Sequence, residues 1–320
     1  MSQQQVLIQA PTSEKLLELF VEDCHVRGLS DETIRRYKSI AQQFLDFVGQ
    51  MNVQAVNVDK YILQDYIRQR RSDSTDQKTL ENEISAISSF FSYLAFQDYV
   101  AKNPVPEVRK RYLTPYKKET EGDVESPRKL ISVEQMSMLI NSVVDTRDKA
   151  ILTLLAKTGL RRGELISLNV TDIDWVGQTI TLEPKRFKKR SGRTVFFDDE
   201  TARLLKRWLK QRESLHPDSP ALFLGERGGR LKRHGIYQMT VKYATAVGLH
   251  DPKSTKVEDH FTPHCFRHWF TTHLRRAGMD REFIKALRGD RRREAIDIYD
   301  RIDRDELRRA YLAYISRLGI

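Results

Sequence analysis

The sequence predicts a mainly α-helical protein with a small antiparallel β-sheet, organised as two domains. A length of 320 residues favours two domains, and a hydrophobic content of 39% is enough for each to have its own core. Apolar residues recur at helical spacing along most of the chain, whereas two short segments near the middle alternate like strands. The positive charge is distributed unequally between the two parts of the chain. Residues 1–127 contain 16 Lys and Arg against 19 Asp and Glu, while residues 128–320 contain 39 against 25.

The first domain is predicted at residues 12–106 as four helices. The first begins at a cap formed by Thr12 and Ser13, the second follows Ser30, the third covers residues 58–71 and the fourth covers residues 79–96. Their aromatic residues are expected to form the core rather than a base-stacking surface. Expected core positions include Leu16, Leu17, Phe20, Ile34, Phe44, Tyr61, Ile62, Tyr66, Ile67, Ile84, Phe90 and Phe91.

A linker is predicted at residues 107–130. Pro104 and Pro106 end the last helix, and the following stretch holds many charges and few apolar residues. The run Arg109, Lys110 and Arg111 can lie along a DNA backbone, and a solvated charge run is the alternative.

The second domain is predicted at residues 131–320. Two strands at 180–183 and 194–197 flank a turn that is rich in Lys and Arg, with Ser191-Gly192 at its tip. Helices are expected at 133–143, 148–158, 199–212, 235–247, 281–287 and 304–318, and one follows His264.

Three motifs far apart in the sequence carry groups suited to phosphodiester chemistry. Thr158-Gly159-Leu160-Arg161 places a guanidinium after a helix that ends at glycine. Thr262-Pro263-His264-Cys265-Phe266-Arg267-His268 places an imidazole and a second guanidinium three residues apart, on one face of a helix. Tyr299 adds a phenol 32 residues after Arg267. Arginine binds phosphate oxygens, histidine transfers a proton and a phenol can attack phosphorus.

The order of these motifs resembles the tyrosine recombinases of the phage integrase family, either Xer-like or archaeal integrase-like, over residues 12–320. The resemblance implies a helical core-binding domain that clamps DNA, followed by a catalytic domain. It implies a site-specific recombinase that cuts and rejoins duplex DNA through a 3′-phosphotyrosine, in integration, excision or dimer resolution. The roles it implies are Tyr299 as nucleophile, Arg161, Arg267 and His264 around the phosphate, Glu164 in support and Arg162 on the DNA backbone.

The basic turn between the two strands is expected to supply a general acid. The 5′-oxygen leaves slowly as an alkoxide, and a lysine whose pKa is lowered by neighbouring cations can protonate it. The resemblance places this lysine in the β-hairpin, where Lys185 is the first candidate and Lys188 the second. The remaining cations are expected to rest on DNA phosphates; they are Arg186, Lys189 and Arg190.

Asp290 stands where the family commonly has histidine, tryptophan or lysine, nine residues before the tyrosine. An ionised carboxylate cannot donate a hydrogen bond to a phosphate oxygen, and it repels the phosphate. Either Asp290 orients an arginine, or Arg288 or the run 291–293 supplies the missing donor. The substitution also leaves open an alternative function, a catalytically impaired DNA-binding protein that keeps the recombinase scaffold.

The positive charge concentrated in the second domain indicates a polyanionic partner, and the family resemblance implies that this partner is double-stranded DNA. The sequence has no P-loop and no acidic metal cluster, so no nucleotide, metal or other cofactor is expected. Cys24 and Cys265 are expected to be structural thiols. No apolar run is long enough to span a membrane and no signal-peptide core follows Met1, so the expected location is the cytoplasm, on the nucleoid.

The C-terminal segment 303–320 carries an apolar stripe at steps of three and four residues. The stripe can pack on its own domain, or, as the resemblance implies, it can dock on a neighbouring protomer. Docking would give a monomer or weak oligomer alone and a homotetramer on paired DNA sites. The residues of the stripe are Leu307, Tyr311, Tyr314, Ile315 and Leu318.

Overall fold

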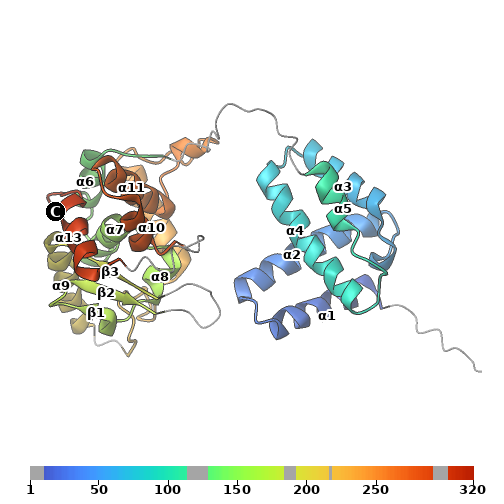
Figure 1. The fold of residues 1–320 in the computed structure, drawn as a ribbon, viewed down its shortest axis with the longest axis horizontal. Coiled ribbons are helices and arrows are strands. Elements are labelled where there is room, and N and C mark those ends of the chain that lie inside the picture. The colour runs from blue at the N-terminus through green and yellow to red at the C-terminus, as the bar shows by residue number, and fades with distance from the viewer. Residues whose placement is uncertain (1–10, 114–128, 184–191, 216–217, 291–301) are drawn as a thin grey trace, which may run out of the picture. The chain divides into compact units, whose positions relative to one another are not determined.

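The computed structural model describes residues 11–113, 129–183, 192–215, 218–290 and 302–320. This part of the chain is mainly helical with one three-stranded antiparallel sheet, as the sequence predicts (Figure 1). The chain divides into two compact units, Met1–Asp123 and Val124–Ile320. Over the described ranges, no helix is both long and apolar enough to cross a membrane.

Side-chain caps begin the first helices of the first unit. The Thr12 side chain accepts a hydrogen bond from the Lys15 amide, and the Ser30 side chain accepts one from the Thr33 amide, so both predicted starts are confirmed. The helices of this unit are α1 (Ser13–Val26), α2 (Asp31–Gln50), α3 (Lys60–Ser72), α4 (Gln77–Phe96) and α5 (Val105–Tyr112), with a 3-10 turn at Ala55–Asn57.

Aromatic side chains fill the core of the first unit. Phe20 and Phe90 are fully buried and meet edge to face with ring centroids 5.4 Å apart. Complete burial of such a side chain contributes about 2–3 kcal/mol. The expected core is wrong at Tyr61, which is 62% exposed, because α3 buries Leu63 and Tyr66 instead.

Helix α5 lies where the composition predicts a linker. Pro104 and Pro106 are tolerated because the first turn of a helix needs few backbone N–H donors. Val108 and Leu113 are each 3% exposed and belong to the core of the first unit. The expectation that the linker begins at residue 107 is therefore wrong for residues 107–113, since these two apolar side chains hold the segment on the unit.

The second unit is built around α7 (Thr146–Thr158), which is buried without interruption from Ala150 to Thr158. A helix that is apolar on every side must be surrounded, and α7 packs against both α9 and α11. The other helices are α6 (Val133–Asn141), α8 (Arg162–Ser167), α9 (Asp199–Ser214), α10 (Arg233–Ala246), α11 (Pro263–Arg276), α12 (Arg281–Arg288) and α13 (Arg304–Tyr314), with 3-10 turns at Val170–Asp172 and Val257–Asp259.

The sheet has the order β1-β2-β3, with antiparallel neighbours. Both predicted strands are present, as β2 (Thr179–Leu182) and β3 (Arg193–Phe196), and Leu182 pairs with Arg193 at the end next to the basic turn. The sequence pattern misses β1 (Ile173–Asp174), because a two-residue strand shows no alternation.

The C-terminal segment packs on its own unit. Tyr311 is 1% exposed and donates a hydrogen bond to the Lys157 carbonyl at 3.0 Å. Lys157 is fully buried, and its ammonium contacts Asp198, Glu200 and the Ser316 carbonyl. Of the two interpretations of this segment, the structure therefore shows the first, in which the apolar stripe packs on its own domain. The predicted helix end at 318 is wrong, since α13 stops at Tyr314 and extended backbone follows.

Candidate active site

Arg161 is aimed by a tight junction between α7 and α8. Gly159 ends α7 in a left-handed conformation with φ +61°, and a Cβ atom there would lie 2.5 Å from the ring of Phe270. Glycine is therefore required twice, for the backbone angle and for the space. Arg161 follows with extended backbone as the N-cap of α8, so its side chain leaves the helix rather than continuing along it.

Glu164 holds Arg161 from within the first turn of α8. Its Oε2 accepts a hydrogen bond from the Arg161 amide at 2.8 Å, and its Oε1 lies 3.1 Å from Arg161 Nη1. Burial opposes the ionisation of Glu164, but hydrogen bonds and charge from Arg193, together with the contacts from Arg161, lower its pKa to about 2. The carboxylate is therefore fully ionised at neutral pH.

Arg267 reaches the same region from α11. Its side chain is 4% exposed, and Nη1 donates to the Gly159 carbonyl at 2.8 Å. Nη2 donates to the carbonyl of Arg288 at 2.9 Å. Burial, and then the charges of Arg161 and Arg288, lower the pKa of Arg267 to about 9, which still leaves the guanidinium protonated at pH 7.

His264 lies in the first turn of α11 and is exposed. Helix α11 begins at Pro263 and so includes His264, and the predicted placement of His264 and Arg267 three residues apart on one helix is confirmed. His273 is structural, because its Nε2 lies 3.0 Å from the Ile131 carbonyl. Cys265 is buried next to the helix start and contacts the Thr262 amide through its sulfur at 3.3 Å.

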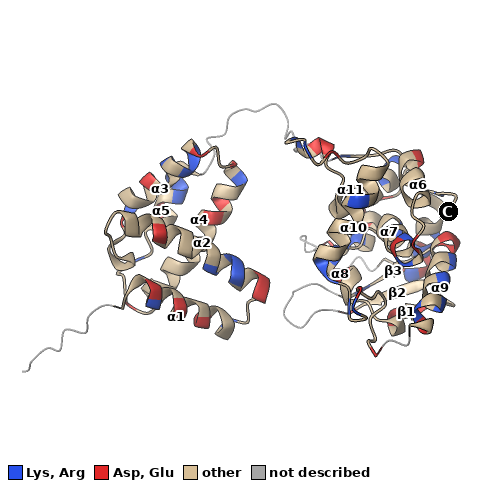
Figure 2. Cartoon of the chain, turned by 180° about the vertical axis from the view of Figure 1, so that it is seen from behind, with Lys and Arg blue, Asp and Glu red and all other residues tan. Residues whose placement is uncertain are grey.

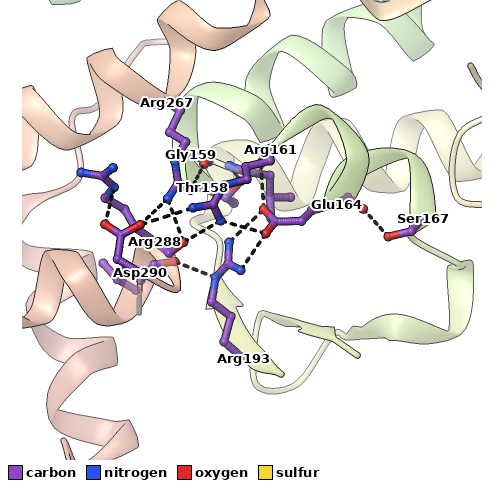
Figure 3. Close-up of polar contacts among 11 residues, drawn as sticks. Thr158, Gly159, Arg161, Glu164, Ser167, Arg193, Arg267, Arg288 and Asp290 are labelled. Carbon is purple, nitrogen blue, oxygen red and sulfur yellow. Dashed lines mark hydrogen bonds and ion pairs between the residues drawn. The ribbon is translucent and has the colours of Figure 1, made fainter. Parts of the chain in front are cut away.

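Asp290 lies among three guanidinium groups (Figure 3). Its Oδ1 is 3.0 Å from Arg267 Nη2 and 3.3 Å from Arg161 Nη2, while Oδ2 is 3.0 Å from Arg288 Nε. Gly289, with φ +61°, ends α12 and turns Asp290 toward them. These contacts agree with the interpretation that Asp290 orients arginines. Arg288 faces this carboxylate.

Arg193 is a site residue that the sequence patterns did not identify. It pairs with both oxygens of Glu164 at 3.0 Å and donates from Nε to the Leu287 carbonyl at 3.0 Å. The sequence does contain a pattern that points to Arg193. Alternate residues of a strand share a face, and Arg193 lies two residues before the apolar Val195. A charged residue on the face of a strand that points into the core is expected to have a buried partner.

Several predicted site residues lie outside the described part of the chain. They are Tyr299 in the segment 291–301, and Lys185, Arg186, Lys188, Lys189 and Arg190 in the segment 184–191. The described residues adjoin both segments, since β3 begins at Arg193 and α12 ends at Arg288. The described members of the expected DNA-contacting set are all exposed: Arg162 on α8, and Arg109, Lys110 and Arg111 on α5.

The arrangement is suited to binding one anion. Two fixed guanidiniums from separate helices converge on a single carboxylate oxygen of Asp290. Such a pair binds an oxygen of a phosphate in the same way. In the described ranges, no group of His, Cys, Asp or Glu side chains could hold a metal ion.

Residues 129–306 match the sequence model of the phage integrase family, and residues 16–100 match that of the phage integrase N-terminal SAM-like domain. The chain belongs to the phage integrase family. Tyrosine recombinase XerC of Roseiflexus sp. is 31% identical to this recombinase, with 87% of this chain and 85% of that protein covered. Tyrosine recombinase XerD of Oceanobacillus iheyensis is 26% identical, over 94% of this chain and 100% of that protein.

Solved structures of recombinases share the fold. The XerH site-specific recombinase bound to a palindromic difH substrate has a TM-score of 0.66 and 18% identity, with 95% of this chain and 81% of that chain covered. The Tn1549 transposon integrase in complex with a circular intermediate DNA also has a TM-score of 0.66, with coverage of 93% and 98% at 18% identity. The protein is a tyrosine-type site-specific recombinase of the Xer-like kind. The alternative of a catalytically impaired scaffold has no support from these relatives.

Proposed function

We propose that this recombinase cuts and rejoins duplex DNA through a covalent bond between Tyr299 and a 3′-phosphate. The observation that carries the proposal is the convergence of Arg161 and Arg267 on one oxygen of Asp290, because a scissile phosphate needs the same pair of donors. Both guanidiniums are held by fixed carbonyls and carboxylates, so little reorganisation is needed when the reaction charge develops.

The steps balance without a cofactor. The Tyr299 oxygen attacks phosphorus as its proton passes to His264, the bond to the 5′-oxygen breaks, and Lys185 protonates that oxygen as it leaves. Arg161, Arg267 and His264 stabilise the pentacoordinate phosphorus. A 5′-hydroxyl of another strand then gives its proton to Lys185 and attacks the 3′-phosphotyrosine, and Tyr299 leaves as the phenol with the proton returned by His264. Lys188 is the second candidate for the general acid.

Asp290 is proposed to support the site rather than to contact the phosphate. Its carboxylate neutralises part of the charge of Arg161, Arg267 and Arg288, and it holds the Arg161 and Arg267 guanidiniums close together. A phosphate that enters between the two guanidiniums competes with Asp290 for the same Nη2 donors, so the carboxylate must turn toward Arg288 when DNA binds.

Double-stranded DNA is the proposed substrate. Residues 128–320 carry 39 Lys and Arg against 25 Asp and Glu, and Figure 2 shows basic residues on α8, α10 and α11. Charge of this sign and concentration favours binding to phosphates with release of counterions. The proposed backbone contacts are Arg109, Lys110, Arg111, Arg162, Arg186, Lys189 and Arg190. The proposed assembly is a homotetramer on paired DNA sites and a monomer or weak oligomer alone. Because segment 303–320 packs on its own unit, this assembly would use other surfaces; λ integrase, a structural relative, is a dimer bound to a COC′ core site.

The test begins with a pool of randomised duplexes, from which the wild-type protein selects the sequences it binds. A nick placed in the selected sequence lets the cleaved fragment diffuse away, so that the covalent product accumulates. We expect a protein-linked 3′ end on a denaturing gel with the wild type. Tyr299→Phe should bind the duplex with near-normal affinity and give no adduct, because only the attacking oxygen is removed. An adduct in Tyr299→Phe would assign the nucleophile to another tyrosine.

A further inference from the structure

Arg193 occupies a closely fitted place between α8 and the end of α12. Its side chain is 11% exposed, and all three nitrogens of its guanidinium are engaged, two with Glu164 and one with the Leu287 carbonyl. A Cβ atom on Gly289 would lie 2.6 Å from Arg193 Nη1, so glycine leaves the space that the arginine fills.

Three segments that carry or adjoin the proposed catalytic groups meet at this side chain. β3 follows the turn that contains Lys185, and its first residue is Arg193 itself. α8 begins after Arg161, and α12 is the helix that precedes Tyr299 in the sequence. A single guanidinium therefore joins the hairpin, the arginine turn and the helix before the nucleophile.

Glu164 transmits this arrangement to the phosphate site. Oε1 accepts from Nη1 of both Arg193 and Arg161, at 3.0 and 3.1 Å, while Oε2 accepts from Arg193 Nη2 and the Arg161 amide. Without Arg193, both carboxylate oxygens are available to the Arg161 guanidinium. A two-pronged pair between these neighbours would draw the Arg161 guanidinium away from the place where it meets Arg267.

Resting on the proposed function, we infer that Arg193 is a positioning residue for DNA cleavage: it fixes the Glu164 carboxylate and, through it, the direction of the Arg161 guanidinium. Lysine cannot replace it, because one ammonium does not bridge two carboxylate oxygens and a carbonyl in the geometry of a planar fork.

The test compares wild type, Arg193→Gln, Arg193→Lys, Glu164→Gln and the Arg193→Gln/Glu164→Gln double variant on the nicked duplex described above. The matched control is Arg207→Gln, which makes the same substitution at an exposed arginine of α9. Single-turnover rate constants are measured at saturating protein, and Kd is measured separately by titration. We expect cleavage to be slower by about 100-fold in Arg193→Gln, with little change in Kd, because a small misplacement of a catalytic group has this effect on rate. Arg193→Lys should remain slow.

A double-mutant cycle and a pH profile separate positioning from a general loss of structure. If Arg193 acts through Glu164, the double variant should be no slower than Glu164→Gln alone. Removal of Arg193 also raises the pKa of Glu164, because burial raises it and the main opposing group is gone. The ratio of the Arg193→Gln rate constant to that of wild type should therefore fall as the pH is lowered, and this fall should be absent in the Glu164→Gln background.

Equal rate constants in wild type and Arg193→Gln, additive losses in the double variant, or a change confined to Kd would each overturn the inference. Arg193→Lys with full activity would also overturn it, and this variant provides the answer if Arg193→Gln does not fold. A wild-type protein that forms no covalent product would instead refute the proposed function. This result is distinguishable from failure of the inference, in which the wild type is active and the variants do not differ from it as expected.

Discussion

Replacement of Glu164 by glutamine tests the electrostatics of the site most directly. Glutamine keeps the size of the side chain and can still accept a hydrogen bond from the Arg161 amide. It removes the negative charge between Arg161 and Arg193, and it turns an N–H₂ donor toward one of two guanidiniums that also donate. We therefore expect Glu164→Gln to destabilise the second unit and to slow cleavage.

The size of the effect follows from the pKa of Glu164. The value is about 2 in the folded protein, against an ordinary value of 4.5. This difference corresponds to roughly 3 kcal/mol of stability at neutral pH, because each unit of pKa difference between the folded and unfolded states is worth about 1.4 kcal/mol. Because the folded pKa is depressed, this contribution is fully present above about pH 5 and is lost as the pH falls from 4.5 toward 2. At about pH 3.5 roughly 2 kcal/mol should remain.

The assay is urea unfolding followed by tryptophan fluorescence. The three tryptophans are Trp175, Trp208 and Trp269, and all lie in the second unit, so the signal reports that unit alone. Wild type and Glu164→Gln are compared at pH 7, where the difference should be near 3 kcal/mol, and at lower pH, where it should shrink. Glu213→Gln, an exposed glutamate on α9, is the control and should change stability little at either pH.

Two results would refute this reasoning. A difference below about 1 kcal/mol at pH 7 would mean that the ion pairs contribute no more than exposed ones do. A difference that stays constant as the pH falls below 4.5 would mean that the carboxylate charge is not its source.

Three further predictions concern the charges around the site. Lys185→Ala should cleave a natural phosphodiester very slowly and recover on a 5′-bridging phosphorothiolate, whose thiolate leaves without protonation; a variant that stays slow would move the acid to Lys188 or elsewhere. Asp290→Asn should bind the selected duplex about fivefold more tightly, since a negative charge beside two phosphate-binding guanidiniums costs about 1 kcal/mol in a water-like environment. Weaker binding of Asp290→Asn in a titration would show that its charge is needed to build the site. Lys157→Met should lower the unfolding free energy by about 3–5 kcal/mol in the fluorescence assay, because Asp198 and Glu200 lose a buried partner, whereas the exposed Lys210→Met should not.

Local patterns predicted most of the helices and part of the site. The caps at Thr12 and Ser30, the left-handed turn at Gly159 and the start of α11 at Pro263 depend on groups a few residues apart, so the sequence displays them directly. The spacing of His264 and Arg267 on α11 has the same origin. The errors arose where packing against distant residues decided the outcome, as at α5 and at the exposed Tyr61.

The sequence by itself determined the residue types, their order and their spacing within each helix, and these were sufficient to indicate the family. Only the tertiary structure decided which charges meet. Arg193 and Glu164 are 29 residues apart, and Arg161 and Asp290 are 129 apart, yet each pair lies within 3.3 Å. Hydrogen bonds and buried ion pairs act over a few ångströms and depend on direction, so their partners are fixed only when α8, β3 and the end of α12 pack together. For this reason Asp290, an exception to the family pattern in the sequence, has identifiable partners only in the fold.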